Sequence, residues 1–188
     1  MIIRLTVIVL LTLQWLYWVI KAKEAHNKKP RLQPILLRSV LERLFNRIPA
    51  FVIMLQLLGI KLLPFPTAVY ISFFGLILFF IGLAISISAR HQLDVNWTNS
   101  YEYQIKRNHS LVIKGIYRYI RHPIYTGLIL TFLGTELVVQ SYLVFTVIFA
   151  MLICYYWGKR EERILLKHFG NTYRNYTERT KMFIPFIF

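Results

Sequence analysis

Polar residues that could do chemistry gather in two short stretches of a strongly apolar chain. The first stretch runs from residue 109 to 127 and contains Arg121, His122 and Pro123 in a row. Proline is tolerated in the first turn of a helix but not in its interior, so a helix is predicted to open at Pro123 with His122 at its cap. The unpaired N–H groups and partial positive charge of a helix N-terminus suit an anionic or polar ligand group. The alternative is that Arg121 and His122 only cap the helix and reach the membrane interface.

The second stretch begins at Lys159 and contains an acidic pair, Glu161 and Glu162, in a chain with only eight acidic residues. A carboxylate at the end of a membrane helix is able to bind a cation or a ribose hydroxyl. The alternative is that both carboxylates pair with Arg and Lys at helical spacing. Gly170 is a predicted helix stop. The residues before it have an apolar face, which predicts a helix along the membrane surface. This face consists of Ile164, Leu165 and Phe169.

The composition of the 188 residues explains where these stretches must sit. The chain is 56% hydrophobic with a formal net charge of +15, and its mean hydropathy is +0.49. Such apolar content is typical of membrane proteins. Basic charge can also indicate nucleic-acid binding, but basic segments flanked by apolar runs favour a membrane surface, and no nucleic-acid partner is expected. Cys154 is the single cysteine, so the sequence predicts no disulfide framework and no metal site.

Five apolar segments are predicted to span the membrane, since a spanning helix needs about 20 mostly apolar residues. They cover residues 2–20, 45–63, 67–89, 125–139 and 142–157. The first could also be read as a signal peptide, but its apolar run is long and no small-residue cleavage site precedes the next basic cluster. The fold class is therefore all-α and polytopic, with about five transmembrane helices.

Several residues mark the predicted connections between these segments. Arg47 and Gln56 weaken the second span, and Pro64 and Pro66 are predicted to end it in a tight turn. The last two spans are separated only around residues 140–141, which predicts a helical hairpin.

Basic residues predict the orientation. With five spans, segments 21–47, 90–121 and 159–181 fall on one side and hold 21 of the 23 Lys and Arg residues. The positive-inside rule then places the N-terminus outside and the C-terminus, with both polar stretches, in the cytosol. Any site they form is expected at the interface, where it would accept an amphiphile.

Small residues recur at helix-face spacing in the third and fourth predicted spans, and such faces let membrane helices approach closely. We interpret them as intramolecular packing rather than a dimer interface, and we expect a monomer. They are Gly75, Gly82, Ser86, Gly127, Thr131 and Gly134.

The polar stretches also carry an ordered set of motifs. These are His109-x-Leu111-Val112, Gly115-x-Tyr117, Arg121-His122-Pro123-x-Tyr125-x-Gly127, and Glu161-Glu162 followed by Phe169-Gly170-x-x-Tyr173. The set resembles the isoprenylcysteine carboxyl methyltransferase family, whose wider group includes phospholipid N-methyltransferases. The resemblance covers roughly residues 90 to 185, about half of the chain, and the earlier spans match it only in hydropathy.

The resemblance implies a single membrane domain, residues 1–188, that methylates a lipid-like or prenylated substrate with S-adenosylmethionine. It implies a cytosolic cofactor pocket formed by the loop before the fourth helix and the C-terminal helical segment. Arg121 and Glu161 would be catalytic, and Lys159 and Arg160 would bind an anionic substrate group. The cofactor residues would be His109, Ser110, Leu111, Val112, Tyr117, His122, Pro123, Ile124, Tyr125 and Glu161.

One departure from the family pattern concerns substrate recognition. Many relatives have an arginine two or four residues before the first Glu of the pair, where this chain has Lys159 and Trp157. Lysine lacks the bidentate fork of arginine. A prenylated cysteine carboxylate is the preferred acceptor, while a phospholipid amine and another lipophilic acid or thiol stay open.

Two other classes of protein remain as alternatives. NADPH-dependent membrane sterol and steroid reductases share the Arg-His-Pro-x-Tyr-x-Gly element, although they typically have Asn at the position of Ile124 and an acidic residue at that of Leu128. A non-catalytic membrane scaffold that has kept the fold is the other alternative.

Overall fold

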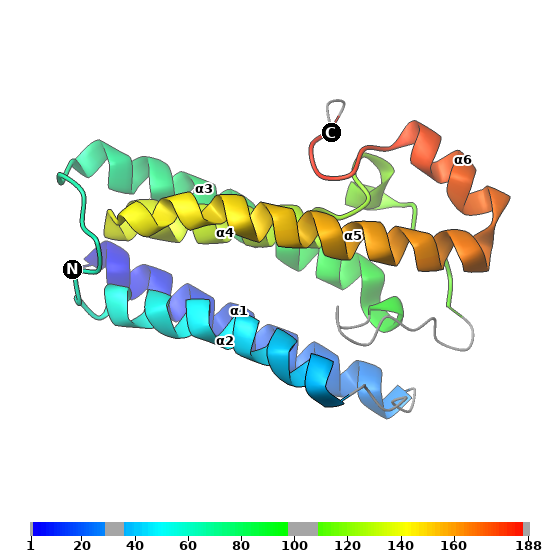
Figure 1. Cartoon of the computed structure of the whole chain (residues 1–188), viewed down its shortest axis with the longest axis horizontal. Helices are drawn as coiled ribbons and strands as arrows, with labels where there is room; N and C mark the ends of the chain where they lie inside the picture. The colour runs from blue at the N-terminus through cyan, green and yellow to red at the C-terminus, as the bar shows by residue number, and fades with distance from the viewer. Residues whose placement is uncertain (1, 29–35, 98–108, 186–188) are drawn as a thin grey trace.

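The computed structural model describes residues 2–28, 36–97 and 109–185, and their regular structure is helical apart from two isolated bridges (Figure 1). The α-helices are α1 (Ile2–Lys28), α2 (Leu36–Leu57), α3 (Val69–Leu93), α4 (Pro123–Val139), α5 (Val147–Phe169) and α6 (Asn171–Arg179). Short 3₁₀ helices are η1 (Asp94–Asn96), η2 (Gly115–Arg118) and η3 (Tyr142–Thr146). The predicted all-α class is confirmed.

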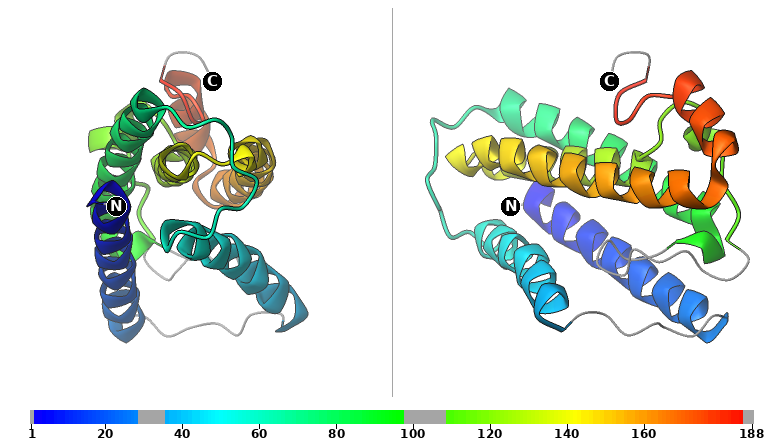
Figure 2. Two further views of the ribbon diagram at one scale, coloured as in Figure 1. Left: turned by 90° about the vertical axis from the view of Figure 1, so that its left-hand side faces the viewer. Right: turned by 45° about the vertical axis from the view of Figure 1, so that its right-hand side comes forward.

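Helices α3, α4 and α5 form one layer, with α4 between the other two, and α1 and α2 lie across from them (Figure 2). The α6 helix, η2 and the start of α4 gather at one end of the molecule, and the α4–α5 hairpin lies at the other (Figure 1). The two polar stretches of the sequence therefore meet at one end.

The α3–α4 interface is the tightest in the molecule because glycines bring the two backbones together. A Cβ atom added at Gly82 would lie 2.5 Å from the Thr131 backbone nitrogen, and one added at Gly127 would lie 2.6 Å from that of Ser86. A real Cβ could not occupy either position without moving the opposite helix. The prediction that the small residues pack within one chain is confirmed.

The apolar helices follow the predicted order. Among the residues that the structure describes, three helices are long and apolar enough to cross a membrane, namely Ile2–Glu24, Val69–Leu93 and Tyr142–Phe169. Two apolar helices in the same ranges are shorter, Arg47–Leu57 and Pro123–Val139. The number of spans and the side on which the chain starts stay predictions.

The second predicted span needs a correction. Helix α2 begins before the predicted start and ends at Leu57, before either of the prolines that were expected to stop it. It ends where Gly59 adopts φ +107°, a conformation that glycine adopts without a steric penalty. Pro64, in the connection between α2 and α3, instead forms an isolated bridge with Ser141 of the α4–α5 hairpin. The hairpin itself is confirmed, with Gln140 in a left-handed conformation between its two arms.

The end of the last span needs a second correction. A separate surface helix was expected from Lys159, but α5 runs without a break from Val147 to Phe169. Its apolar face after Gly158 consequently turns toward the interior, and Ile164 and Leu165 line a cavity there. Gly170, with φ +54°, ends the helix as predicted.

Candidate active site

The start of α4 is held in place by the C-terminal segment. Arg121 N donates to the Lys181 carbonyl at 2.8 Å and His122 N donates to the Met182 carbonyl at 3.0 Å. The Thr126 hydroxyl donates to the Phe183 carbonyl at 2.9 Å. As predicted, α4 opens at Pro123 with His122 at its N-cap position. These bonds fix the backbone direction from which the side chains of the site project.

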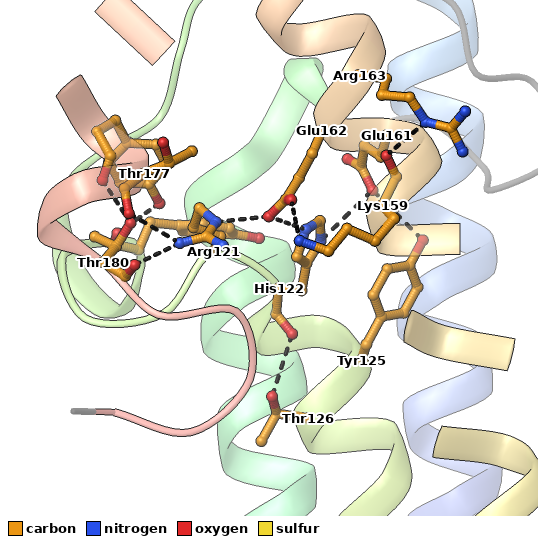
Figure 3. Close-up of polar contacts among 12 residues, drawn as sticks. Arg121, His122, Tyr125, Thr126, Lys159, Glu161, Glu162, Arg163, Thr177 and Thr180 are labelled. Atoms are coloured by element: carbon orange, nitrogen blue, oxygen red, sulfur yellow. Dashed lines mark hydrogen bonds and ion pairs between the residues drawn. The ribbon is translucent and has the colours of Figure 1, made fainter. Parts of the chain in front are cut away.

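Glu162 is the centre of a buried ionic network at this end (Figure 3). Its carboxylate accepts from Arg121 Nε at 2.6 Å and from Lys159 Nζ at 3.3 Å. His122 Nε2 lies 3.5 Å from the same carboxylate. Arg121 also donates to the carbonyls of Thr177 and Thr180, so its guanidinium joins α5 to α6 and to the residue that follows it. With side-chain exposures of 10% for Arg121 and 12% for Glu162, this pair is largely shielded from water.

Glu161 differs from its neighbour because its carboxylate remains accessible, with 39% of the side chain exposed. The Tyr125 hydroxyl donates to it at 3.5 Å, and His122 Nδ1 lies 3.7 Å away. The His122 and Tyr125 rings stack with their centroids 5.5 Å apart. The accessible carboxylate of Glu161 thus lies beside the phenol of Tyr125 and the buried imidazole of His122 (Figure 3).

Buried tyrosines close the site on the side of α6. The Tyr117 hydroxyl donates to the Ala89 carbonyl at 3.4 Å, and the Tyr176 hydroxyl donates to the Tyr117 carbonyl at 2.7 Å. Burial raises the pKa of both phenols well above their usual range. Both side chains therefore remain neutral hydroxyl donors at physiological pH.

The segment that bears His109 is fastened to the end of α3. The Asn96 side-chain amide donates to the Ser110 hydroxyl at 3.0 Å, and its carbonyl accepts from Ser110 N at 3.1 Å. Further on, Gln92 accepts from Ile116 N at 3.0 Å. Gly115 adopts φ +60° directly against the Gln92 side chain, where a Cβ would collide with it. The glycine of the Gly-x-Tyr motif therefore lets the backbone approach the Gln92 side chain closely, and this approach positions the Tyr117 ring.

These elements surround a cavity of about 790 Å³. Its polar end contains Glu161, His122 and Tyr125, and its apolar end runs between α2, α4 and α5. The apolar lining consists of Pro49, Ala50, Ile53, Leu128, Ile129, Phe132, Phe149, Ala150, Ile153 and Cys154. The volume is typical of a site that binds a small organic ligand.

Most of the residues singled out from the sequence meet in this cavity. Those that line it are His109, Ser110, Leu111, Val112, Tyr117, Arg121, His122, Ile124, Tyr125 and Glu161. Pro123 is fully buried at the start of α4 and does not line the cavity, and neither do Lys159 and Arg160. The ligand-binding role of each residue remains a prediction.

Other residues in and around the cavity were not among the site residues predicted from the sequence. Trp18 lies on α1, far along the chain from every motif, and reaches the cavity only through the packing of α1 against α3. Tyr173 and Tyr176 also line it from α6. Glu162 was recognised as half of an acidic pair, but its central position in the network depends on tertiary contacts.

The comparisons with known proteins point in one direction. A family model described as phospholipid methyltransferase matches residues 70–172. A probable protein-S-isoprenylcysteine O-methyltransferase of Oryza sativa subsp. indica is 30% identical over 121 residues, which cover 63% of this chain and 63% of the relative. The Schizosaccharomyces pombe protein-S-isoprenylcysteine O-methyltransferase is 30% identical over 110 residues, 57% of this chain and 46% of the relative.

A solved structure agrees with these sequence matches. The eukaryotic intramembrane Ras methyltransferase, isoprenylcysteine carboxyl methyltransferase, superposes with a TM-score of 0.56 at 26% identity. The match covers 63% of this chain and 43% of that one.

A helical membrane fold with a polar and apolar cavity at one end defines the class of protein, and the family match defines its group. The chain belongs to the phospholipid methyltransferase family, in the group that includes the isoprenylcysteine carboxyl methyltransferases. It spans less than two thirds of the length of the curated relatives it matches.

Proposed function

We propose that the chain is an S-adenosylmethionine-dependent methyltransferase that acts on a lipophilic acceptor at the membrane–cytosol interface. The favoured reaction is carboxyl O-methylation of an isoprenylcysteine-like substrate. The single observation that carries this proposal is the cavity, which joins an accessible carboxylate and aromatic rings at one end to an apolar channel between helices at the other. A polar cofactor would occupy the first end and a lipophilic acceptor the second.

The residues at the polar end suit S-adenosylmethionine. The half-exposed carboxylate of Glu161 accepts hydrogen bonds from ribose hydroxyls or pairs with a cationic group. The faces of Tyr125 and His122 are suited to stacking, and a phenol ring near a sulfonium stabilises its positive charge. Backbone and side-chain groups of Ser110, held by Asn96, provide further polar contacts on the opposite wall.

Bound S-adenosylmethionine supplies an electrophilic methyl group on a sulfonium, and the chain has to align an acceptor with it and exclude water. Rigid positioning contributes most of the rate in such a displacement. The Arg121–Glu162 pair and the C-terminal hydrogen bonds keep His122 and the start of α4 fixed. A carboxylate acceptor is already a nucleophile and requires no general base, only a cation that positions it.

An amine acceptor is the second candidate, favoured by the description of the matched family as phospholipid methyltransferase. An ammonium must lose a proton before it attacks a methyl group, so a base is needed. Glu161 is accessible from the cavity and His122 lies beside it, so either could take that proton.

We also propose that this end of the molecule faces the cytosol, with the N-terminus on the other side, and that the chain acts as a monomer. The positive-inside pattern supports the orientation, since most basic residues lie in the segments that join this end.

Binding and turnover measurements on the purified full chain test the proposal. Wild type should bind S-adenosylhomocysteine, and Glu161→Gln should weaken that binding about tenfold or more. Glu178→Gln, on the exposed surface of α6, is the matched control and should leave it unchanged. Methyl-labelled S-adenosylmethionine should then label an S-prenylated cysteine acid in preference to phosphatidylethanolamine. Tight NADPH binding without any response to S-adenosylhomocysteine would contradict the proposed function.

A further inference from the structure

Arg90, in the last turn of α3, is a wholly buried guanidinium with unused hydrogen-bonding capacity. Its Nη1 donates to the Asp94 carbonyl at 3.1 Å, whereas Nε and Nη2 have no hydrogen-bond partner. Within the part of the chain that the structure describes, no carboxylate forms an ion pair with it. Because arginine stays protonated, burying these donors without a partner costs free energy.

Two indole rings cover the guanidinium without satisfying those donors. The guanidinium carbon lies 4.3 Å from the centroid of the Trp97 ring and 5.8 Å from that of Trp18. Contacts of this kind stabilise the positive charge through the ring faces. The N–H groups of arginine lie in the plane of the guanidinium and still require acceptors.

The unused edge has the geometry of a carboxylate-binding site. Nε and Nη2 form one side of the planar fork, from which two parallel hydrogen bonds reach the two oxygens of one carboxylate. Two other basic groups near the site, Arg121 Nε and Lys159 Nζ, both donate to Glu162. Arg90 differs from them because two donors on one edge of its guanidinium have no hydrogen-bond partner.

Arg90 lies directly behind the wall of the cavity. Trp18 and Trp97 touch its guanidinium and also line the cavity, as does Leu93 on the same helix. Arg90 itself does not line the cavity. Because Arg90 is wholly buried, a ligand reaches its edge only when part of this cover moves. Of the two indole rings, that of Trp97 lies nearer the guanidinium.

We propose that Arg90 binds a carboxylate through Nε and Nη2 when a ligand enters the cavity, and that Trp97 turns aside to admit it. The proposal rests on the proposed methyl transfer, in which two ligands carry a carboxylate. One is the amino-acid end of S-adenosylmethionine, and the other is a prenylated cysteine acceptor.

Two matched ligand pairs, each with and without a carboxylate, test this assignment by binding rather than activity. The first pair is S-adenosylhomocysteine and 5′-methylthioadenosine, which lacks the amino-acid end. The second is an S-prenylated cysteine acid and its primary amide. Affinities are measured on the full chain for wild type, Arg90→Met, Arg90→Lys and the control Arg118→Met, whose side chain is exposed on η2.

We expect Arg90→Met to lower the affinity for the carboxylate ligand of one pair about tenfold or more. The affinity for the ligand of that pair without a carboxylate should be unchanged. The pair that responds identifies the source of the carboxylate. Arg90→Lys should lose much of the same selectivity because it keeps the charge without the fork. Arg118→Met should change neither pair.

Equal weakening of all four ligands, or none, in Arg90→Met would overturn the assignment. If Arg90→Met does not fold, Arg90→Lys decides, and unchanged ratios in both pairs would overturn it. If wild type binds S-adenosylhomocysteine and the Arg90 variants keep the wild-type affinity ratios of both pairs, only this assignment is rejected. Wild type that binds neither adenosine ligand rejects the proposed function itself.

Discussion

The α3–α4 interface and the α1–α2 side of the cavity are built in opposite ways. Between α3 and α4, glycines at positions such as 82 and 127 leave no space for a single added Cβ atom. On the other side, α2 lines an open channel with Pro49, Ala50 and Ile53. The first interface lies within residues 70–172, which the family match covers, while α1 and α2 precede that match.

The difference suggests that the two regions have separate roles. The closed α3–α4 pair fixes the relative position of Asn96, in η1 directly after α3, and His122, at the start of α4. The N-terminal pair closes the apolar channel with residues outside the family match. We infer that cofactor binding depends on the α3–α4 region and acceptor selection on the α1–α2 region.

The largest expected effect comes from filling the α3–α4 interface. Gly82→Leu should abolish the folded state, because even its Cβ would lie 2.5 Å from the Thr131 backbone nitrogen. Gly82→Ala should lower the free energy of unfolding by about 1–3 kcal/mol. Thermal unfolding in detergent measures both. The control is Ala84→Leu, which points away from the protein on the same helix; equal tolerance of residues 82 and 84 would show that the backbones are not in close contact.

Breaking the buried ionic network should have the next largest effect. Glu162→Gln leaves the Arg121 guanidinium buried beside a neutral amide, so the free energy of unfolding should fall by about 3 kcal/mol. S-adenosylhomocysteine binding should fall with it, because His122 loses its fixed position. Lys159→Gln removes the more exposed partner, 44% exposed, and should have a much smaller effect. Equal losses of unfolding free energy in both variants would mean that the Arg121–Glu162 pair stabilises the fold no more than the more exposed Lys159–Glu162 pair.

Altering the apolar channel should change acceptor binding alone. Ala50→Phe fills space on the α2 wall, so the affinity for an S-prenylated acceptor should fall about tenfold. S-adenosylhomocysteine affinity should be unchanged, since residue 50 lies outside the polar end. Met54→Phe, which adds an outward-facing ring on the same helix, is the control. Parallel losses of both ligands in Ala50→Phe would contradict the division between the two regions.

Sequence patterns predicted the α3–α4 interface better than the α1–α2 side of the cavity, for a physical reason. Spacing of Gly82, Gly127 and their neighbours reports a local requirement, the absence of a side chain, that is visible in one helix at a time. Pro123 and Gly170 likewise mark helix ends through their own backbone preferences. Most of the site residues predicted from the motifs also lie together in the cavity.

Features that depend on packing between distant segments were not predictable in this way. Trp18 and Arg90 are ordinary members of their helices until α1 packs against α3. Helix α2 ends early, at Leu57, next to Gly59 with its positive φ, whereas Pro64 and Pro66 were predicted from the sequence to end it.

Removing the Tyr125 hydroxyl should have the smallest effect and is the finest measure of the polar end. Tyr125→Phe keeps the ring that stacks on His122 but removes a donor 3.5 Å from Glu161, at the long limit of a hydrogen bond. S-adenosylhomocysteine affinity should fall about threefold, with thermal stability and acceptor affinity unchanged. Tyr70→Phe, on the exposed surface of α3, is the control. A loss as large as that of Glu161→Gln would mean that the hydroxyl contacts the cofactor directly, whereas no loss would leave ring stacking as the sole contribution of Tyr125 to cofactor binding.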